Sequence, residues 1–282
     1  TLVENITIDE DDLAAIISRE LVERNDIVDG MFYWSGDEET SPRVNTKSTS
    51  LREGDGHLTT LSTLYEMNKQ FITHIFGWSE VDFQFLHDLT ESEVEDMKNQ
   101  IYLIWDELFK TLDFWKTSDP GLMKNHTPPE QRDDDSMDHL LFWPVGQIGL
   151  AKYIATELDE ELGNDEINTK AIKKVLKNLE NIDWDMFSPP WKGYILREVA
   201  TKPDPSNRVK NQEWQWKMGN SGKYQERVTE MIRFLLGKAY TEKDLEEALK
   251  SKWDSTLELN RPTDDEINKM WKYILNQRKN LT

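Results

Sequence analysis

Apolar residues recur at steps of three and four along most of this chain, and this spacing limits the fold more than any other feature. The clearest example lies in residues 91–116, where the apolar positions are Val94, Met97, Ile101, Ile104, Trp105, Leu108, Leu112 and Trp115. On a helix these positions share one face. Thr90 precedes the segment and Glu93 follows three residues later, which is the pattern of a capping box. The segment therefore predicts a long amphipathic helix.

The same spacing predicts further helices over residues 9–23, 57–76, 136–162, 168–180, 223–236, 242–252 and 264–278. The last two segments open with TEKD and TDDE, which again have the form of a capping box. Pro144 falls inside the segment 136–162, where it either kinks the helix or starts its second part.

Strand patterns are scarce. Residues 31–50 could hold a short strand or an ordered loop, and residues 193–200 could be strand or helix. Two loops, 117–135 and 201–212, exceed the usual length of a connection. We expect a mainly α protein, an irregular multi-helix bundle with long loops and at most a short strand pair. It would form a single helical domain over residues 1–282, with a possible subdivision near residues 163–167.

The composition indicates a folded protein without a membrane span. The chain of 282 residues contains 11 Trp, 10 Phe and 8 Tyr, enough apolar volume for a core and more than disordered chains carry. No run approaches the roughly 18 apolar residues of a membrane-spanning helix. The first residues, TLVENITIDEDD, lack the pattern of a signal peptide. Because an initial Met is absent, we expect a fragment or a processed product.

The chain has no cysteine. This excludes disulfides, a thiolate nucleophile and a cysteine zinc site, and it fits a reducing cytoplasm. The formal charge of −20 opposes indiscriminate binding to phosphate backbones.

One segment of the chain has a net positive charge, although the chain as a whole is acidic. Residues 192–233, here called the basic window, contain five acidic residues and nine basic ones, so the window carries a formal charge of +4. The basic residues are Lys192, Arg197, Lys202, Arg208, Lys210, Lys217, Lys223, Arg227 and Arg233. The local potential there should differ in sign from that of the remaining chain.

The basic window also contains the aromatic residues Trp214, Trp216 and Tyr224. Nucleic-acid sites combine cations for phosphates with aromatic faces for unpaired bases. We therefore predict DNA-binding residues in this window, with phosphate contacts from Arg197, Lys202, Arg208, Lys210, Lys217, Lys223 and Arg227. Trp214 and Trp216 would act as stacking groups. Alternatively, one Trp of EWQWK packs inward and the other lies against a neighbouring side chain.

Catalytic motifs are weak. The segments KMGNSGKY (217–224) and GDGH (54–57) both depart from the phosphate-loop pattern. In the first, Lys217 stands where Gly is required and Tyr224 stands where Ser or Thr is required. A turn before a helix is the simpler interpretation. We expect no enzyme activity, no catalytic residue and no cofactor.

Metal-binding patterns are also weak. No two histidines share a helix face at ligand spacing among His57, His74, His87, His126 and His139. The segment RDDDSMDHLL gathers groups that could hold a hard cation such as Mg²⁺: Asp133, Asp134, Asp135, Asp138 and His139. We favour solvated acids that complement a helix dipole, and expect no metal. Asp183 and Asp185 could form a catalytic pair, although Asp183 is equally suited to cap a helix.

The segment NIDWDMFSPPWKGYIL (181–196) concentrates aromatic residues beside a Pro-Pro pair. Ser188 could cap a helix and Pro189 could occupy its first position. The aromatic residues at steps of three or four are Trp184, Phe187, Trp191 and Tyr194. We predict a buried aromatic corner that fixes the direction in which the following basic segment leaves the helical body; the alternative is a ligand-binding surface.

Five segments occur in an order that resembles a known family. They are HLTTLSTLYEMNKQFI, LDFW, DHLLFWPVGQIGLAKYIATEL, LENIDWDMFSPPWKGYIL and MIRFLLGKAYTEKDLEEAL. Their motifs are Leu-Ser-x-Leu-Tyr, the small residues Gly146 and Gly149, Asp183-Trp184 before Trp191 and Gly193, and Leu236-Gly237. The series resembles the later half of DndB-like, DGQHR-domain proteins of bacterial DNA phosphorothioation clusters. Order and spacing carry the match, over about residues 10–255.

The resemblance implies a C-terminal part of a longer protein, because the Asp-Gly-Gln-His-Arg motif is absent here. The family carries that motif in an earlier domain similar to the ParB fold, and its members act as DNA-binding transcriptional regulators. The implied partners are DNA and other proteins of the modification system, with a homo-oligomer possible and no membrane. One alternative is a protein scaffold without DNA contact. Another is part of a nucleotide-hydrolysing enzyme.

Overall fold

Helices dominate the structure, as the apolar periodicity predicts. The computed structural model describes residues 12–33, 43–79, 86–132, 135–163, 165–200, 214–219, 221–238 and 263–282, together with positions 243 and 247. Within these ranges the mainly α fold class is confirmed. The described helices are also too short or too polar to cross a membrane.

The helices lie close to the segments that the periodicity marks. They are α2 (Leu13–Glu23), α3 (Leu61–Ile75), α4 (Glu91–Thr111), α5 (Phe114–Thr117), α6 (Pro144–Leu162), α7 (Thr169–Leu176), α8 (Gly222–Leu235) and α10 (Asp264–Leu281). Short 3₁₀ turns are η1 (Val28–Gly30), η3 (Leu86–Asp88), η4 (Pro129–Gln131), η5 (Leu140–Phe142) and η6 (Leu179–Asn181). The helix predicted over 242–252 lies outside the described residues, apart from positions 243 and 247.

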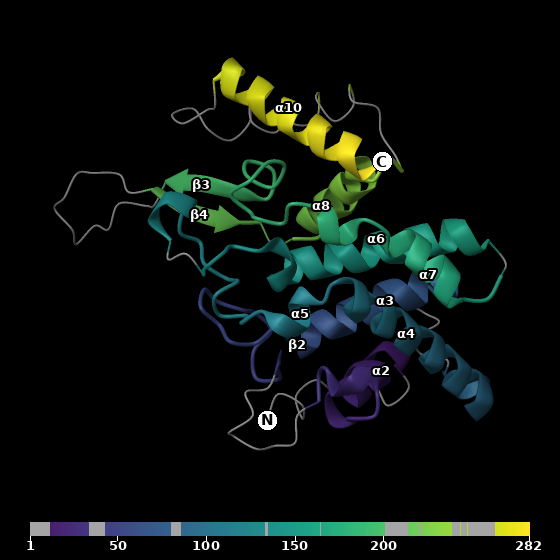
Figure 1. Ribbon diagram of the computed structural model, residues 1–282. Helices are drawn as coiled ribbons and strands as arrows, with labels where there is room; N and C mark the ends of the chain where they lie inside the picture. Colours follow the sequence, from purple (N-terminus) through teal and green to yellow (C-terminus); the bar gives the residue numbers. More distant parts are fainter. Residues whose placement is uncertain are drawn as a thin grey trace.

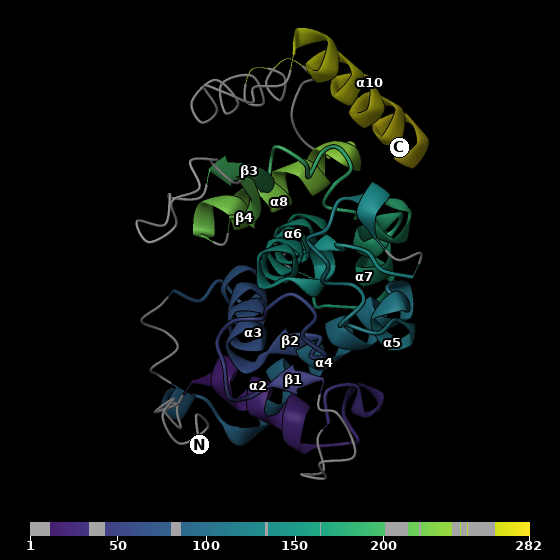
Figure 2. The same ribbon diagram turned by 90° about the vertical axis from the view of Figure 1, so that its left-hand side faces the viewer.

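The helices are stacked along the vertical direction of Figure 1, from α2 at the bottom through α3, α6 and α8 to α10 at the top. Figure 2 shows the same order from the side. The central helix, α6, packs most extensively against α3 and α8. Its buried residues run almost without interruption from Pro144 to Leu158. A helix that is buried on all sides is expected at the centre of such a stack.

Three buried polar side chains tie α2, α3 and α4 together inside the apolar core. Trp105 Nε1 donates a hydrogen bond to Asn68 Oδ1 (2.9 Å), and Asn68 Nδ2 donates to Ser18 Oγ (2.9 Å). Because these atoms are buried, each hydrogen bond offsets a desolvation penalty. Phe71 packs edge-on against the ring of Trp105, with 5.9 Å between the ring centroids.

The two described capping boxes form as predicted. Thr90 N donates to Glu93 Oε2 (2.7 Å), and Glu93 N donates to Thr90 Oγ1 (3.3 Å) at the start of α4. Thr263 and Glu266 make the same exchange at the start of α10. Each box satisfies backbone donors that the first helical turn leaves free.

Two helix boundaries differ in detail from the periodicity. Pro144 is the first residue of α6, so it starts the helix rather than kinking it. The helix predicted over 91–116 ends at Thr111, because Leu112 (φ −105°, ψ 62°) leaves the helical region. Phe114 then begins the separate short helix α5.

The described chain contains two strand pairs, where the sequence led us to expect at most one. The strands β1 (Val44–Asn45) and β2 (Thr59–Thr60) are parallel. The strands β3 (Leu196–Ala200) and β4 (Trp214–Met218) form an antiparallel pair. The ambiguous segment 193–200 is thus a strand over its last five residues.

The aromatic corner is buried, as predicted. Trp184, Phe187, Trp191 and Tyr194 are all at most 6% exposed. The rings of Trp184 and Trp191 are stacked, with 5.5 Å between centroids. The predicted helix start at Ser188 and Pro189 is wrong: residues 186–195 form turns that lead directly into β3. Helical hydrogen bonding stops after Ile195 N donates to Trp191 O (2.8 Å), because the next residues pair with β4.

Candidate functional site

The described part of the basic window is built around the hairpin of β3 and β4. Arg197 of β3 is the register partner of Lys217 of β4, so two basic residues stand opposite each other. Trp216 is opposite Glu198, and Trp214 is opposite Ala200. The alternative in which one Trp packs inward and the other lies against a neighbouring side chain concerns side chains outside the described part of the structure.

Of the seven predicted phosphate contacts, two are exposed, four have side chains outside the described part of the structure, and one, Arg227, is buried. Lys217 and Lys223 are exposed, and Lys223 stands in the first turn of α8. The side chain of Arg197 and the residues Lys202, Arg208 and Lys210 lie outside the described part of the structure, as do the side chains of Trp214 and Trp216.

Arg227 corrects one of these predictions. It is 6% exposed, and its Nη1 donates a hydrogen bond to Tyr194 O (3.0 Å). Its guanidinium carbon lies 4.6 Å from the ring centroid of Tyr224 and 5.5 Å from that of Tyr194. Arg227 therefore packs α8 onto the aromatic corner, and its side chain is not placed to contact a phosphate.

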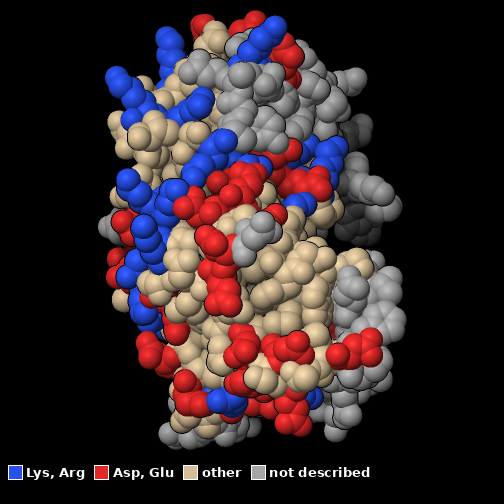
Figure 3. Space-filling view, turned by 90° about the vertical axis from the view of Figure 1, so that its right-hand side faces the viewer, with Lys and Arg blue, Asp and Glu red and all other residues tan. Residues whose placement is uncertain are grey.

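The structure brings together a second set of basic residues, here called the lysine edge. Its members are exposed on α7 and its C-cap and on α10: Lys170, Lys173, Lys174, Lys177, Lys269, Lys272 and Lys279. In Figure 3, Lys and Arg side chains follow the left edge of the molecule from α10 at the top to the level of α7. This edge differs in sign from the chain's net charge of −20.

Backbone and side-chain contacts hold the two parts of the lysine edge together. Asn178 Nδ2, just after α7, donates a hydrogen bond to Leu281 O in the last turn of α10 (2.7 Å). Two of the lysines have carboxylate partners: Lys173 lies 3.5 Å from Glu107, and Lys174 lies 2.5 Å from Glu161. The Lys174–Glu161 pair is largely exposed and contributes only about 0–1 kcal/mol, so Lys174 can exchange partners readily. Glu107 is buried and also pairs with Lys110 at 2.7 Å, so it does not depend on Lys173 alone.

The sequence contains a signal for the lysine edge, but counting charges within the basic window did not reveal it. On α10 the steps from Lys269 to Lys272 and from Lys272 to Lys279 are three and seven, which keep all three lysines on one face. On α7 the steps from Lys170 to Lys173 or Lys174 and on to Lys177 do the same. Only the fold shows that the C-terminal ends of these two helices meet, because they are about a hundred residues apart in sequence.

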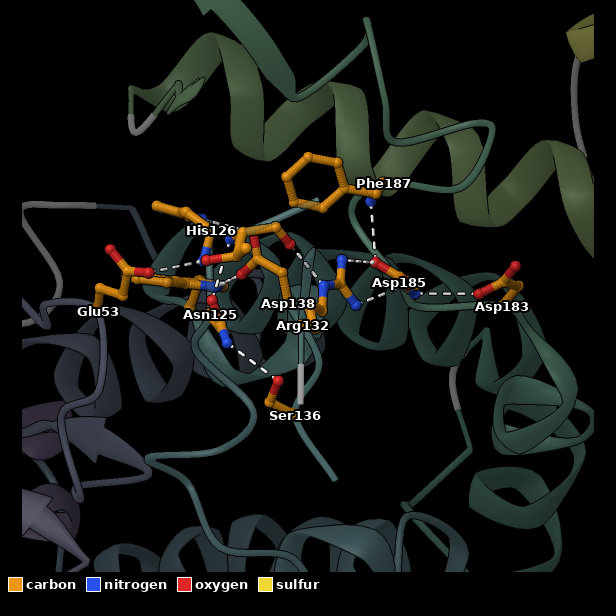
Figure 4. Close-up of polar contacts among 11 residues, drawn as sticks. Glu53, Asn125, His126, Arg132, Ser136, Asp138, Asp183, Asp185 and Phe187 are labelled. Carbon is orange, nitrogen blue, oxygen red and sulfur yellow. Dashed lines mark hydrogen bonds and ion pairs between the residues drawn. The ribbon is translucent and has the colours of Figure 1, made fainter. Parts of the chain in front are cut away.

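A second constellation lies in the loop between α5 and α6 (Figure 4). Asp138 is fully buried, and its Oδ2 lies 2.5 Å from His126 Nδ1. Its other oxygen accepts a hydrogen bond from Trp143 Nε1 (2.8 Å). The imidazole of His126 stacks on the Trp143 ring, with 4.6 Å between centroids. Backbone N–H of His126 donates to Glu53 Oε1 (3.2 Å), which ties a second loop to the same point.

Arg132 joins this loop to the aromatic corner. Its guanidinium makes two hydrogen bonds of 3.0 Å to the carboxylate of Asp185, and its Nε donates to Thr127 O (2.6 Å). Asp183 Oδ1 accepts from Asp185 N (3.0 Å), and Tyr273 Oη donates to Asp183 Oδ2 (2.6 Å). The two aspartates are thus engaged with Arg132, Tyr273 and a backbone turn instead of forming a catalytic pair.

A buried lysine, Lys124, holds the loop that carries His126 in place. The side chain of Lys124 donates hydrogen bonds to His57 O (2.8 Å) and Pro120 O (2.7 Å). Burial lowers the pKa of Lys124 to about 8. Asp55 pairs with His57 through a contact of 2.5 Å between Oδ1 and Nδ1. These contacts fasten the loop of residues 53–57 to the loop that carries His126.

The acidic segment RDDDSMDHLL is described only in part. Asp133 and Asp134 lie outside the described residues, and Asp135 is exposed. Asp138 is buried against His126 and Trp143, so the prediction of solvated acids is wrong for this residue. Among the described side chains, no group of three His, Asp or Glu residues is arranged to hold a metal ion.

The chemistry of the His126 constellation is that of a histidine oriented by a buried carboxylate. Such a pair can transfer protons when the second ring nitrogen faces a substrate. Here the imidazole lies flat on Trp143, and the contacts of its neighbours join the loops around residues 53–57, 124–139 and 183–187. We interpret the constellation as a structural clamp that fixes the loops between the α3–α6 layer and the β3–β4 hairpin.

In comparisons with known proteins, no protein family, no curated protein and no solved structure matches the chain. Its class is therefore defined by its own structure. It is a mainly α protein with a polar clamp between its loops and a lysine edge along α7 and α10.

Proposed function

We propose that this protein is a DNA-binding helical module whose main contact surface is the lysine edge. The observation that carries the proposal is a set of seven exposed lysines on two adjoining helices of a chain with a formal charge of −20. A DNA duplex carries one phosphate charge per about 1.7 Å of its axis, so a row of lysines can replace several condensed counterions at once. Lysines also suit phosphate contacts that do not read sequence.

The hairpin of β3 and β4 provides a second group of candidate contacts. Lys217 of β4 and Lys223 in the adjoining first turn of α8 are exposed, as a phosphate contact requires. In Figure 1 the hairpin lies at the left of the molecule and α7 at the right, so the hairpin and the α7 part of the lysine edge would contact separate stretches of DNA. This arrangement makes their contributions separable by mutation.

The regulatory part of the proposal comes from the resemblance to DndB-like proteins. By that resemblance, DNA binding would serve transcriptional regulation of a DNA phosphorothioation cluster in the bacterial cytoplasm. The resembling segments cover about residues 10–255, which include α7 and the hairpin but not α10. The lysine edge is therefore supported by charge and geometry alone.

The test is a binding titration with a fluorescein-labelled 30-base-pair duplex, followed by anisotropy over a series of NaCl concentrations. The double variant Lys170→Gln/Lys279→Gln removes one charge from each helix of the lysine edge. If both lysines contact phosphates, the slope of log K against log salt should fall by about 2, and affinity at moderate salt should fall roughly tenfold.

The matched control is Lys47→Gln/Arg52→Gln, which removes two exposed positive charges near β1. This control should leave the slope almost unchanged. A third variant, Lys217→Gln/Lys223→Gln, measures how much the basic residues at the hairpin contribute to DNA binding. Equal losses in the lysine-edge variant and the control would contradict the proposal, because the effect would then reflect net charge alone.

A protein-interaction scaffold is the second candidate function, and the acid excess of the chain favours it. Most of the surface of a chain with a charge of −20 would repel a duplex. The same titration separates the two candidates. If the wild-type chain fails to bind the duplex even at low salt, the scaffold is the better description.

A further inference from the structure

A surface pocket lies where α3 and α6 end on the same side of the molecule. Its volume is about 230 Å³, and its apolar wall consists of Ile75, Phe76, Leu162 and Ile167. These four residues are partly buried and pack against the core, so the wall is held in place. Pockets for drug-sized ligands span about 300–1,000 Å³. This pocket is therefore of a size for one long side chain.

The charged side chains that line the pocket are all negative, and Gln100 adds a neutral polar group. Asp159, Asp165 and Glu166 line it and are exposed. The helix ends add to this field, because the C-caps of α3 and α6, Phe76 and Gly163, also line the pocket and a helix C-terminus carries roughly half a negative charge. The described lining includes no Lys or Arg.

The basic groups near the pocket for which contacts are seen are either uncharged or paired with carboxylates that do not line it. Burial lowers the pKa of His74, which precedes Ile75, so its imidazole carries no charge at neutral pH. Lys174 is paired with Glu161 at 2.5 Å, and Lys152, whose charge acts on His74, is paired with Glu226 at 3.4 Å. Arg233 is paired with Glu160 at 2.7 Å. Figure 3 shows the result on this face: a column of acidic side chains beside a broad uncharged area.

We propose that this pocket receives an arginine side chain of a partner protein. The aliphatic part of arginine would pack on Ile75 and Ile167, as long basic side chains do on apolar surfaces. Its planar guanidinium would then donate paired hydrogen bonds to the carboxylates of Asp165 and Glu166. Arginine suits this site better than lysine because the guanidinium is more weakly hydrated. This function is separate from DNA binding, since the same field repels phosphate.

The test uses the full chain with ¹³C-labelled isoleucine methyl groups, observed by NMR at low salt. The probe is N-acetyl-L-arginine amide, and N-acetyl-L-citrulline amide is its neutral counterpart of almost equal shape. Arginine amide should shift the methyl signals of Ile75 and Ile167 in a saturable way. Citrulline amide should bind roughly fivefold more weakly or not at all.

Two variants with the same change in charge complete the test. Asp165→Asn/Glu166→Gln should weaken the arginine probe roughly fivefold, whereas Glu130→Gln/Asp135→Asn, on the loop before α6, should not. Unchanged methyl signals elsewhere would show that the fold is intact. Equal responses to both probes, or equal losses in both variants, would overturn the proposal. So would Ile75 and Ile167 signals that move on dilution without probe, because a second copy would then occupy the pocket.

Discussion

At the scale of single residues, His139 shows how the protein accommodates a titratable group in its core. Its ring lies 4.7 Å from that of Phe114 and 6.4 Å from that of Trp184, between centroids. Its Nδ1 accepts a hydrogen bond from Leu141 N (3.2 Å), which requires that nitrogen to be unprotonated. Burial lowers the pKa of His139 to about 3. The residue is thus neutral in the folded protein at any ordinary pH.

This burial predicts a loss of stability in mild acid. Below pH 6.5 an unfolded chain binds a proton at His139 that the folded protein excludes, so the free energy of unfolding should fall as pH falls, by at most about 1.4 kcal/mol per pH unit. His139→Asn retains an acceptor for Leu141 N without the titration. Between pH 7.5 and pH 5.0, urea unfolding should show a decrease about 2 kcal/mol larger in the wild type than in the variant.

Both proteins have an uncharged side chain at position 139 at pH 7.5. Any difference in their free energy of unfolding at that pH therefore measures packing, and it is subtracted from the difference at pH 5.0. Parallel pH dependences would contradict the assignment of His139 as a buried neutral histidine.

Prediction from sequence succeeds for residues whose environment is local and fails for pairs that only the fold creates. The burial of Trp184 and Trp191 follows from the size of their side chains, although the helical spacing used to predict it does not apply to a segment that forms turns. The clamp between Arg132 and Asp185 joins positions 53 residues apart. His126 and Asp138 belong to a loop, where neither the helical nor the strand period tells which side chains meet.

At the scale of elements, the junction of α6 and α8 depends on the absence of a side chain. A Cβ atom at Gly149 would lie 2.6 Å from Val228 Cβ and 2.9 Å from Gln225 O. Thr229 Oγ1 also donates a hydrogen bond to Gly149 O (2.8 Å). Gly149 therefore allows the two helix backbones to approach closely. A glycine inside a helix does not by itself predict such a close contact.

Gly149→Ala should accordingly destabilise the protein. Alanine favours the helix by about 1 kcal/mol relative to glycine, but overpacking typically costs about 1–3 kcal/mol, and Val228 belongs to a buried helix face that cannot move freely. We expect a net loss of about 1–2 kcal/mol in urea unfolding.

Gly222→Ala, in the first turn of α8, is the control, because nothing lies within 4 Å of a Cβ atom there. It should be neutral or stabilising. If Gly149→Ala were equally stable, the close contact of α6 and α8 would have to be looser than these distances indicate.

Element boundaries were predictable where a local signal marks them. Thr90 and Thr263 start helices because their side chains satisfy free backbone donors nearby. Ser188 and Pro189 carry an equally good start signal, yet no helix follows, because the chain forms turns up to residue 195 and then enters β3, which pairs with β4. A distant strand therefore overrides a local preference. The lysine edge was not predicted either, because it combines the faces of two helices that are remote in sequence.

At the scale of the whole molecule, the two proposed surfaces lie side by side. On the face that Figure 3 shows, basic side chains gather along the left edge, with some acidic ones among them, and a column of acidic side chains lies beside them. If both proposed surfaces are used, DNA along α7 and α10 would lie next to a partner protein held at the end of α6. Repulsion between the acidic column and the phosphates would then confine the duplex to the lysine edge.

The net charge of −20 has a further consequence for stability. Like charges destabilise a compact state over long distances, whereas surface ion pairs act locally and contribute little. Raising NaCl from 0.01 M to 0.15 M shortens the screening length from about 30 Å to about 8 Å. The midpoint of thermal unfolding should therefore rise with salt by about 2–4 °C, the equivalent of about 1 kcal/mol.

The salt gain should follow net charge across three proteins. It should be largest for Lys170→Gln/Lys279→Gln, which is more negative than the wild type by two charges, and smallest for Asp165→Asn/Glu166→Gln, which is less negative by two. Differential scanning fluorimetry at the two salt concentrations measures all three. A midpoint that falls with salt, or gains in the reverse order, would mean that local ion pairs such as Lys174–Glu161 outweigh the repulsion of the whole molecule.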